Sequence, residues 1–309
     1  MKYNTSVLLA LASFSVFAQE ASPPGAPATL KQVAQQAVLN SPEVTSKWHA
    51  YRAADEEIGV ARGGYFPRVD LTAGTGRESL KQPPVSTRND YTRTGVLLSL
   101  NQMIFDGFAT RNEVRRLDKA KLVRYYELLD ASEAIALEAS RAYLDVLRYR
   151  HLVDLAKDNY IQHKATYDQI ERRTQSGVGR RVDFEQAGSR LALAEINLIT
   201  ESANLHDVSA RYQRLVGSQP VDAIAPPVQV GTAFPAQAKA ALDTLHQKNP
   251  ALLAATENIE AAQYEINTRR AAYSPKLDFR ARTDQTDNYL GASGNRDYNV
   301  AELVVSWNL

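Results

Sequence analysis

The chain reads SGVGRR at residues 176–181, between two long segments that both carry a helical pattern. Before this motif, apolar residues recur from Ile135 to Ile170 with alternating steps of four and three. After it, the same spacing continues from Phe184 to Leu215, broken where Glu201 occupies an apolar position. Steps of four and three place apolar side chains along one stripe of a helix, as in a coiled coil. The sequence therefore predicts two helices that run antiparallel and meet at this turn.

The first of these helices is predicted to be unusually long. No proline occurs between Pro84 and Pro220, so a helix can run from about Gly107 to Gln175, which at 1.5 Å per residue is about 100 Å. A second apolar stripe lies on its opposite side, at Leu137, Leu144, Leu147 and Leu155. Stripes on two sides indicate two neighbours, as in a tubular array of helices. A helix buried in a compact bundle is the alternative.

The N-terminus predicts export from the cytoplasm. Residues 1–18 combine Lys2, a short apolar segment and a small-residue cleavage site, which together are typical of a signal peptide. Residues 19–28 are rich in proline and glycine and are predicted to form a flexible tether. The sequence has no cysteine, which excludes disulfides and thiol chemistry. With 44% hydrophobic residues and a net charge of +1, the chain lacks the basic character of a nucleic-acid-binding protein.

A tandem repeat organises the rest of the chain. Sliding the sequence by 208 residues aligns 42–73 with 250–281 without a gap, and ten of these 32 positions are identical. This predicts a first repeat at 29–217, with a helix, two strands and the long helical hairpin. A proline-rich linker at 218–238 and a second repeat at 239–309 follow. The second repeat contains only a helix and two strands, so we expect a C-terminal truncation that removes a second long hairpin.

Alternation of apolar and polar residues predicts two strands in each repeat. Val69, Leu71 and Ala73 alternate with polar residues in the first strand, and a similar run follows Gly95. In the last strand one face is apolar and is predicted to contact lipid, through Ala301, Leu303, Val305 and Trp307. Four strands cannot close a barrel, so closure requires further chains. A water-soluble sheet with one buried face would show the same alternation.

No catalytic, cofactor-binding or metal-binding site is predicted. The five histidines are not spaced three or four residues apart as helical metal ligands are. The sequence also contains no phosphate-binding loop, nucleotide fingerprint or Ser-His-Asp order. The sequence therefore predicts that the protein is not an enzyme.

These ordered features resemble the TolC family of outer-membrane channel proteins. The resemblance rests on the signal peptide, the two Asn-Ser-Pro or Lys-Asn-Pro helix starts, the FDG motif at 105–107 and the Gly-Val-Gly turn followed by Asp183. It implies a mainly α fold with membrane β-strands, in which long antiparallel helical hairpins form a periplasmic tunnel. In this family three identical chains form a homotrimer and contribute β-hairpins to a 12-stranded outer-membrane β-barrel. The turn region and the end of the second long helix are most similar to members that serve type I secretion of large adhesins.

The resemblance also implies partners and a function. Members form the outer-membrane channel of a tripartite export system, for type I protein secretion or efflux, together with a periplasmic adaptor and an inner-membrane transporter of the ABC or RND class. The alternative function from the residues alone is a non-conducting periplasmic coiled-coil scaffold or adaptor. The sequence identifies neither the substrate nor the transporter. It also does not identify gating residues, which we expect in the absent second hairpin.

The turn between the long helices is the candidate docking site for the adaptor. Gly177 and Gly179 permit the reversal of the chain, and Asp183 with Gln186 fits a capping box that restarts the helix. A turn alone does not require an exposed Val178 flanked by arginines, whereas a docking surface does. The predicted docking tip comprises Ser176, Gly177, Val178, Gly179, Arg180, Arg181 and Asp183. A purely structural turn is the alternative.

Overall fold

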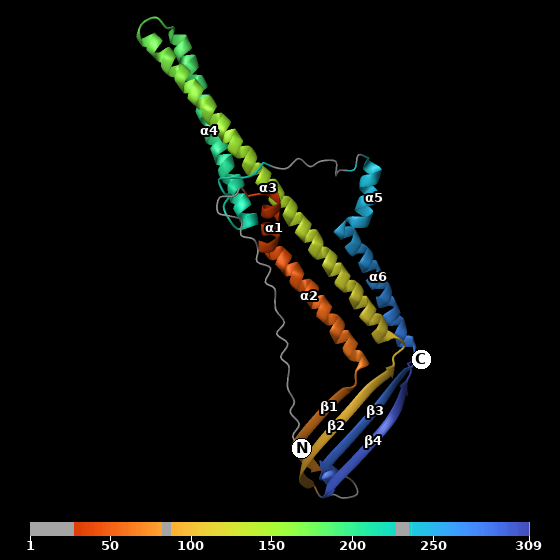
Figure 1. Ribbon diagram of the computed structural model, residues 1–309. Helices are drawn as coiled ribbons and strands as arrows, with labels where there is room; N and C mark the ends of the chain where they lie inside the picture. The colour runs from red at the N-terminus through yellow and green to blue at the C-terminus, as the bar shows by residue number, and fades with distance from the viewer. Residues whose placement is uncertain (1–27, 82–87, 227–234, 236, 309) are drawn as a thin grey trace, which may run out of the picture. The chain divides into compact units, whose positions relative to one another are not determined.

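Figure 1 shows a computed structural model of the chain, which describes residues 28–81, 88–226, 235 and 237–308. The predicted signal peptide at 1–18, most of the tether at 19–28 and part of the linker at 218–238 lie outside these ranges. The chain divides into two compact units. Unit 1 contains the described parts of 1–33, 143–213 and 218–227, and unit 2 contains those of 34–142, 214–217 and 228–309.

The elements occur twice in the same order. The first series is α1 (Leu30–Asn40), α2 (Pro42–Arg62), η1 (Gly63–Tyr65), β1 (Arg68–Leu80), β2 (Asn89–Phe105), α3 (Ala109–Gln175) and α4 (Arg181–Val216). The second is α5 (Ala238–Lys248), α6 (Pro250–Arg270), η2 (Ala271–Tyr273), β3 (Lys276–Asp287), η3 (Tyr289–Gly291) and β4 (Asn295–Ser306). In each series a helix is followed by two strands, and the predicted end of the long helix at Gln175 is confirmed. The predicted division into a first repeat at 29–217 and a second at 239–309 stays a prediction.

The equivalent helices α2 and α6 begin in the same way. The side chains of Ser41 and Asn249 accept hydrogen bonds from the backbone N–H of Val44 (3.4 Å) and Leu252 (2.9 Å), and a proline follows each cap. Proline suits the first helical position because its missing N–H would have no partner there. These short motifs fix where each repeat's helix starts.

All four strands form one antiparallel sheet in the order β1-β2-β3-β4, in unit 2 (Figure 1). Strand β2 pairs with β3, so the sheet joins the two copies of the repeat. The strands are longer than the alternating runs in the sequence indicate. Residues such as Thr75 and Thr94 extend the ladder between β1 and β2, but polar residues on both faces leave no alternation to detect.

The N-terminal half of α3 packs between α2 and α6 in unit 2 (Figure 1). Lys121 on α3 pairs with Asp55 on α2 (2.8 Å), whereas Lys119 pairs with Glu257 (2.9 Å) and Glu260 (2.6 Å) on α6. The two carboxylates raise the pKa of Lys119, because their hydrogen bonds favour its charged form. Helix α3 therefore has a neighbour on each of two sides in this unit.

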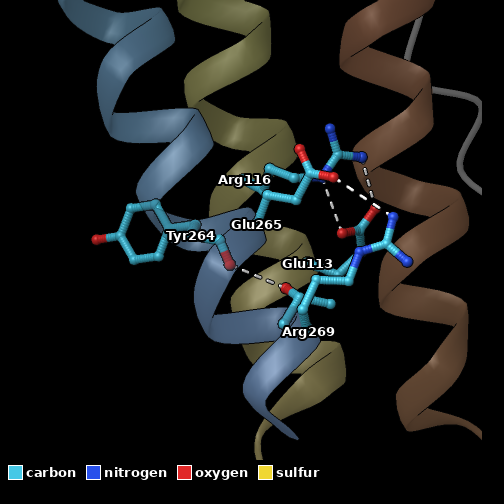
Figure 2. Close-up of polar contacts among 6 residues, drawn as sticks. Glu113, Arg116, Tyr264, Glu265 and Arg269 are labelled. Carbon is cyan, nitrogen blue, oxygen red and sulfur yellow. Dashed lines mark hydrogen bonds and ion pairs between the residues drawn. The ribbon is translucent and has the colours of Figure 1, made fainter. Parts of the chain in front are cut away.

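A second group of charged residues lies between α3 and α6 near the sheet (Figure 2). Figure 2 shows Glu113 and Arg116 on α3 facing Glu265 and Arg269 on α6. Arg116 donates two hydrogen bonds to Glu113 (2.6 and 2.9 Å), which hold the pKa of Glu113 below its usual value, and nearby Arg269 acts in the same direction. Arg269 pairs with Glu265 at 3.4 Å. Charges of alternating sign thus line this helix contact.

In unit 1 the C-terminal half of α3 and helix α4 form the predicted hairpin. Val146, Ala187, Ala194 and Tyr212 of the predicted seam are buried, and the rings of Tyr167 and Phe184 lie 5.2 Å apart near the turn. The second predicted stripe is different: within the described chain Leu137, Leu144 and Leu155 are exposed, and Leu147 is half-buried. The two-sided packing of α3 therefore occurs nearer its N-terminus than predicted.

A described part of the proline-rich linker is tied to this hairpin. Ala28 forms an isolated parallel bridge with Ile224, and the hydroxyl of buried Tyr143 lies at the carbonyl of Ala225. Arg150 donates hydrogen bonds to the carbonyls of Pro220 (3.3 Å), Val221 (2.8 Å) and Asp222 (2.9 Å). These contacts hold residues 220–225 against α3.

Candidate functional site

The docking tip begins where α3 ends. The N–H of Val178 donates to the carbonyl of Arg173 (3.1 Å), and the N–H of Gly177 donates to the carbonyl of Thr174 (3.1 Å). This pair of bonds is a Schellman motif, which terminates a helix with one residue at positive φ. That residue is Gly177, at φ 78°. The predicted role of Gly177 in the reversal is confirmed.

The turn also requires glycine at position 179, but for a steric reason. Its φ is not in the left-handed region, but a Cβ there would lie 2.8 Å from the backbone nitrogen and 2.7 Å from the hydroxyl of Thr174. Its own N–H donates to the carbonyl of Arg173 (2.8 Å). The chain therefore passes so close to the end of α3 that no side chain fits.

The predicted capping box at Asp183 and Gln186 is wrong. Helix α4 begins at Arg181, and the N–H of Phe184 donates to the carbonyl of Arg180 (3.4 Å), so Asp183 lies inside the first helical turn. The reversal at Gly179 brings the chain into helical geometry three residues earlier than the capping pattern indicates. In the first turn the carboxylate of Asp183 still interacts favourably with the positive end of the helix dipole.

The two helices leave a groove of about 570 Å³ next to the turn. Val178, Gly179, Arg180 and Asp183 of the predicted tip line it, whereas Ser176, Gly177 and Arg181 do not. Val178 is 75% exposed. Further lining residues include His163, Ile170, Arg173, Gln186 and Arg190. The groove is therefore basic, with three arginines against one carboxylate.

Sequence reasoning missed the contribution of α4 to this groove. Asp183, Gln186 and Arg190 are separated by three and four residues, a spacing that places them on one face of a helix. His163, which the sequence assigned to the seam, also lines the groove. The helical spacing after the turn was a usable signal, but the supposed cap at Asp183 obscured it. Two tip residues outside the groove have other partners. The hydroxyl of Ser176 donates a hydrogen bond to the carbonyl of Arg173 (3.0 Å), and Arg181 forms an ion pair with Glu185 (3.7 Å).

The sheet carries the second candidate surface. Residues paired across strands share a face, and the register Val69↔Leu100, Leu100↔Ala281 and Ala281↔Ala301 therefore defines one face across all four strands. We call it the apolar face. Its apolar residues are Val69, Leu71, Ala73, Val96, Leu98, Leu100, Leu277, Phe279, Ala281, Ala301, Leu303 and Val305. The same register also places Gln102, Thr283, Gln285, Asp297 and Asn299 on this face.

The apolar face is uncovered in the described chain. Leu303 and Val305 are 66% and 69% exposed, and Leu71 and Val69 are similarly open. Trp307, predicted to belong to the same strand face, follows the end of β4 at Ser306, and its indole N–H donates to the carbonyl of Tyr273 (3.0 Å). A contiguous apolar surface of this extent indicates contact with lipid or another apolar partner.

The opposite face of the sheet is polar. It carries arginines paired with carboxylates, in the pairs Arg68–Asp70 (2.9 Å), Arg93–Glu78 (2.7 Å) and Arg280–Asp278 (3.4 Å). We call it the polar face, and it also contains Arg282, Asp284, Arg296 and Glu302. The two faces differ in polarity as do the two surfaces of a transmembrane β-strand.

Within the described ranges, no helix combines the length and apolarity needed to cross a membrane. The same residues contain no group of three His, Cys, Asp or Glu side chains placed to hold a metal ion.

The long hairpin and the two-faced sheet define a class of outer-membrane channel folds. The crystal structure of the Campylobacter jejuni CmeC outer membrane channel matches with a TM-score of 0.78, covering 91% of this chain and 61% of CmeC, at 14% identity. The sequence pattern of the family described as outer membrane efflux protein matches residues 33–218, and the chain belongs to that family.

Two curated relatives extend this finding. The outer membrane efflux protein BepC of Brucella suis is 27% identical over 282 residues, which cover 91% of this chain and 60% of BepC. The alkaline protease secretion protein AprF of Pseudomonas aeruginosa is 24% identical over 280 residues, which cover 87% of this chain and 58% of AprF. The chain thus spans less than two thirds of the length of these relatives. The predicted family, fold class and outer-membrane location are confirmed, and the family is a transport class.

Proposed function

We propose that the chain is the outer-membrane channel component of a tripartite export system. Three copies would each contribute four strands to a closed barrel and long helices to a periplasmic tunnel. The separation of an apolar and a polar face on the four-stranded sheet carries this proposal. In this function the protein binds no cofactor and catalyses no reaction, because the duct acts through its shape and its lining.

Lipid is the partner that best fits the apolar face. Burying a valine or leucine side chain stabilises a protein by about 1.5–3 kcal/mol, and many such side chains are open on this face. In the part of β3 and β4 that carries Leu277, Phe279 and Ala281, the charged residues Asp278, Arg280 and Glu302 lie on the polar face. Insertion with the apolar face toward lipid therefore gains apolar burial and keeps the ion pairs in water.

The edges of the sheet favour closure by other copies of the chain. Strands β1 and β4 lie at the ends of the strand order, so each has one edge without a partner in the described chain. Unpaired backbone groups in hydrocarbon cost several kcal/mol each. Pairing β4 of one copy with β1 of the next removes these edges in a cyclic trimer.

Cysteine variants at two adjacent valines test this orientation. Val304 lies on the polar face and Val305 on the apolar face, and the chain has no native cysteine. In outer-membrane preparations we expect a water-soluble maleimide to label Val304→Cys and to leave Val305→Cys unlabelled. Both variants should label alike after unfolding in detergent. Equal labelling of the two in the membrane, or the reverse pattern, would contradict the duct.

We further propose that the docking tip binds a periplasmic adaptor. A contact of this kind would bury Val178, and an unpaired carboxylate there would cost about 2 kcal/mol or more, which weakens binding more than tenfold. Val182 is equally exposed (75%) but lies outside the groove. The pair Val178→Asp and Val182→Asp therefore separates docking from a general effect of charge near the tip.

The expected result is loss of adaptor cross-linking and of export for Val178→Asp, with trimer yield and membrane insertion unchanged. Val182→Asp should retain both activities. If Val178→Asp cross-linked to the adaptor as well as the wild type does, the docking tip would be a structural turn without a docking role. In this assembly an inner-membrane transporter of the ABC or RND class supplies the energy, and the exported cargo is a protein or a small molecule.

A further inference from the structure

Two arginines on the polar face stack on tyrosine rings near the β3–β4 turn. The guanidinium of Arg282 lies 5.0 Å from the ring centre of Tyr298, and that of Arg296 lies 4.2 Å from Tyr289 and 5.7 Å from Tyr298. The order along the face is thus Arg282, Tyr298, Arg296 and Tyr289. We call this group the arginine–tyrosine ladder. A ring stacked under a guanidinium restrains it and leaves its N–H edges free.

These two arginines differ from the others on the polar face. Arg68, Arg93 and Arg280 each pair with a carboxylate, whereas Arg282 and Arg296 form no ion pair within the described chain. The carboxylates nearest in register are Asp284, opposite Tyr298, and Glu302, diagonal to Arg282, and neither forms an ion pair with these two arginines in the described chain. Asp284 accepts a hydrogen bond from the hydroxyl of Thr286 (2.6 Å). The two guanidinium groups of the ladder are therefore held by tyrosine rings and not by carboxylates.

The turn that supplies Tyr289 is held in an unfavourable backbone conformation. Asn288 and Leu290 flank it at φ 55° and 50°, in the left-handed region that residues with side chains seldom adopt. The side chain of Asn288 donates to the carbonyl of Thr92 on β2 (2.9 Å), and its N–H donates to the carbonyl of Gly294 (3.0 Å). Strained residues fixed by such contacts concentrate at ligand-binding sites.

We propose that the arginine–tyrosine ladder binds the carboxylate or phosphate group of an anionic solute. This inference rests on the proposed duct, in which the polar face lines the lumen and the ladder lies toward the β3–β4 turn. Planar guanidinium groups bind such anions through two parallel hydrogen bonds. In a trimer the ladder occurs three times around the lumen, so an anion meets several restrained cations as it leaves. The exported cargo is accordingly of a class that carries negative charge.

Citrate titration by calorimetry tests the ladder on the purified protein in detergent, without requiring conduction. We expect the double variant Arg282→Gln/Arg296→Gln to bind citrate about tenfold more weakly than the parent, or worse. Arg280→Gln removes the same charge from the same face, but its arginine is already paired with Asp278, so it should bind as the parent does. Tyr298→Leu keeps both cations and should weaken binding severalfold, because it removes the ring between them.

Absence of citrate binding by the parent, or parental affinity in the double variant, would overturn the ladder. Equal losses in Arg280→Gln and the double variant would also overturn it, since a general charge effect would then suffice. Planar bilayers separate this inference from the duct itself. If the protein conducts, citrate added on the turn side should reduce the conductance of the parent more than that of the double variant. If the protein binds citrate but forms no channel, the proposed channel function is contradicted, whereas anion binding by the ladder is still supported.

Discussion

Replacing Tyr143 by phenylalanine should release the linker from α3 without disturbing the hairpin. Tyr143 is fully buried, and its hydroxyl lies at the carbonyls of Ala28 (3.0 Å) and Ala225. A hydroxyl donates one proton, and Ala28 already accepts a hydrogen bond from the N–H of Ala225 (3.1 Å). The carbonyl of Ala225 is therefore the group that depends on Tyr143.

The magnitude follows from that dependence. The ring of phenylalanine fills the same space, so the substitution leaves no cavity and removes one donor. A fully buried carbonyl left without a partner costs about 1–3 kcal/mol, and because Ala225 is half-buried this range is an upper bound for its carbonyl. The lost hydrogen bond lowers the free energy needed to open the linker locally by the same amount. Amide hydrogens in the bridge between Ala28 and Ile224 should therefore exchange about 5- to 150-fold faster in Tyr143→Phe than in the parent. Helix α4 should exchange at its original rate.

Hydrogen exchange followed by mass spectrometry measures both regions at once. Tyr212 provides the matched control, because it is buried in the same unit and its hydroxyl forms no hydrogen bond with the described residues. Tyr212→Phe should leave exchange at 220–226 unchanged. If Tyr143→Phe exchanged there at the parental rate, the hydroxyl would not hold the linker. Faster exchange throughout α3 and α4 would instead assign Tyr143 a role in packing.

Two further predictions concern the helices. At the tip, Gly179→Ala should destabilise the turn by roughly 1–3 kcal/mol, because its Cβ would collide with the backbone of Thr174, whereas Gly177→Ala costs about 1 kcal/mol from positive φ alone. Trypsin cleavage at the tip should rank the two, and the opposite order would refute the close approach. The lowered pKa of Glu113 gives stability that is present above the ordinary pKa of about 4.3 and is lost as the pH falls through the depressed value. When the pH is lowered below 4, the melting temperature of Glu113→Gln should therefore fall less than that of the parent. An equal fall in both proteins would contradict the role of the hydrogen bonds between Glu113 and Arg116.

The helices and the repeat could be predicted because their signals are local. Pro42 and Pro250 mark helix starts through backbone chemistry that needs no tertiary partner. The ends of the strands were harder, because residues near Thr94 pair with β1 and β3 without any apolar alternation. The fully buried Tyr143 lies beside the seam spacing, and its partners are far away in sequence, so no periodic pattern reports it.

In the candidate site, too, some features could be predicted from the sequence and others could not. Gly177 was predictable from the turn it allows, whereas Gly179 matters through a close contact that only the folded chain displays. Asp183 was misassigned because the capping pattern and a first-turn acidic residue look alike in sequence, and the helix start decides between them. The apolar face followed from alternation along β4, but its continuity across four strands depends on the register of β2 against β3.

The pairing of β2 with β3 also constrains when this protein can fold. Strand β2 ends at Phe105, and its partner β3 begins at Lys276, after both long helices have been made. Until β3 arrives, the outer edge of β2 is an unsatisfied template that any other extended segment can join. Pairing between such distant segments is also slow. The four-stranded sheet therefore cannot be completed until residues 276–287 have been made, and the edge of β2 stays open for the whole time that the two long helices are synthesised.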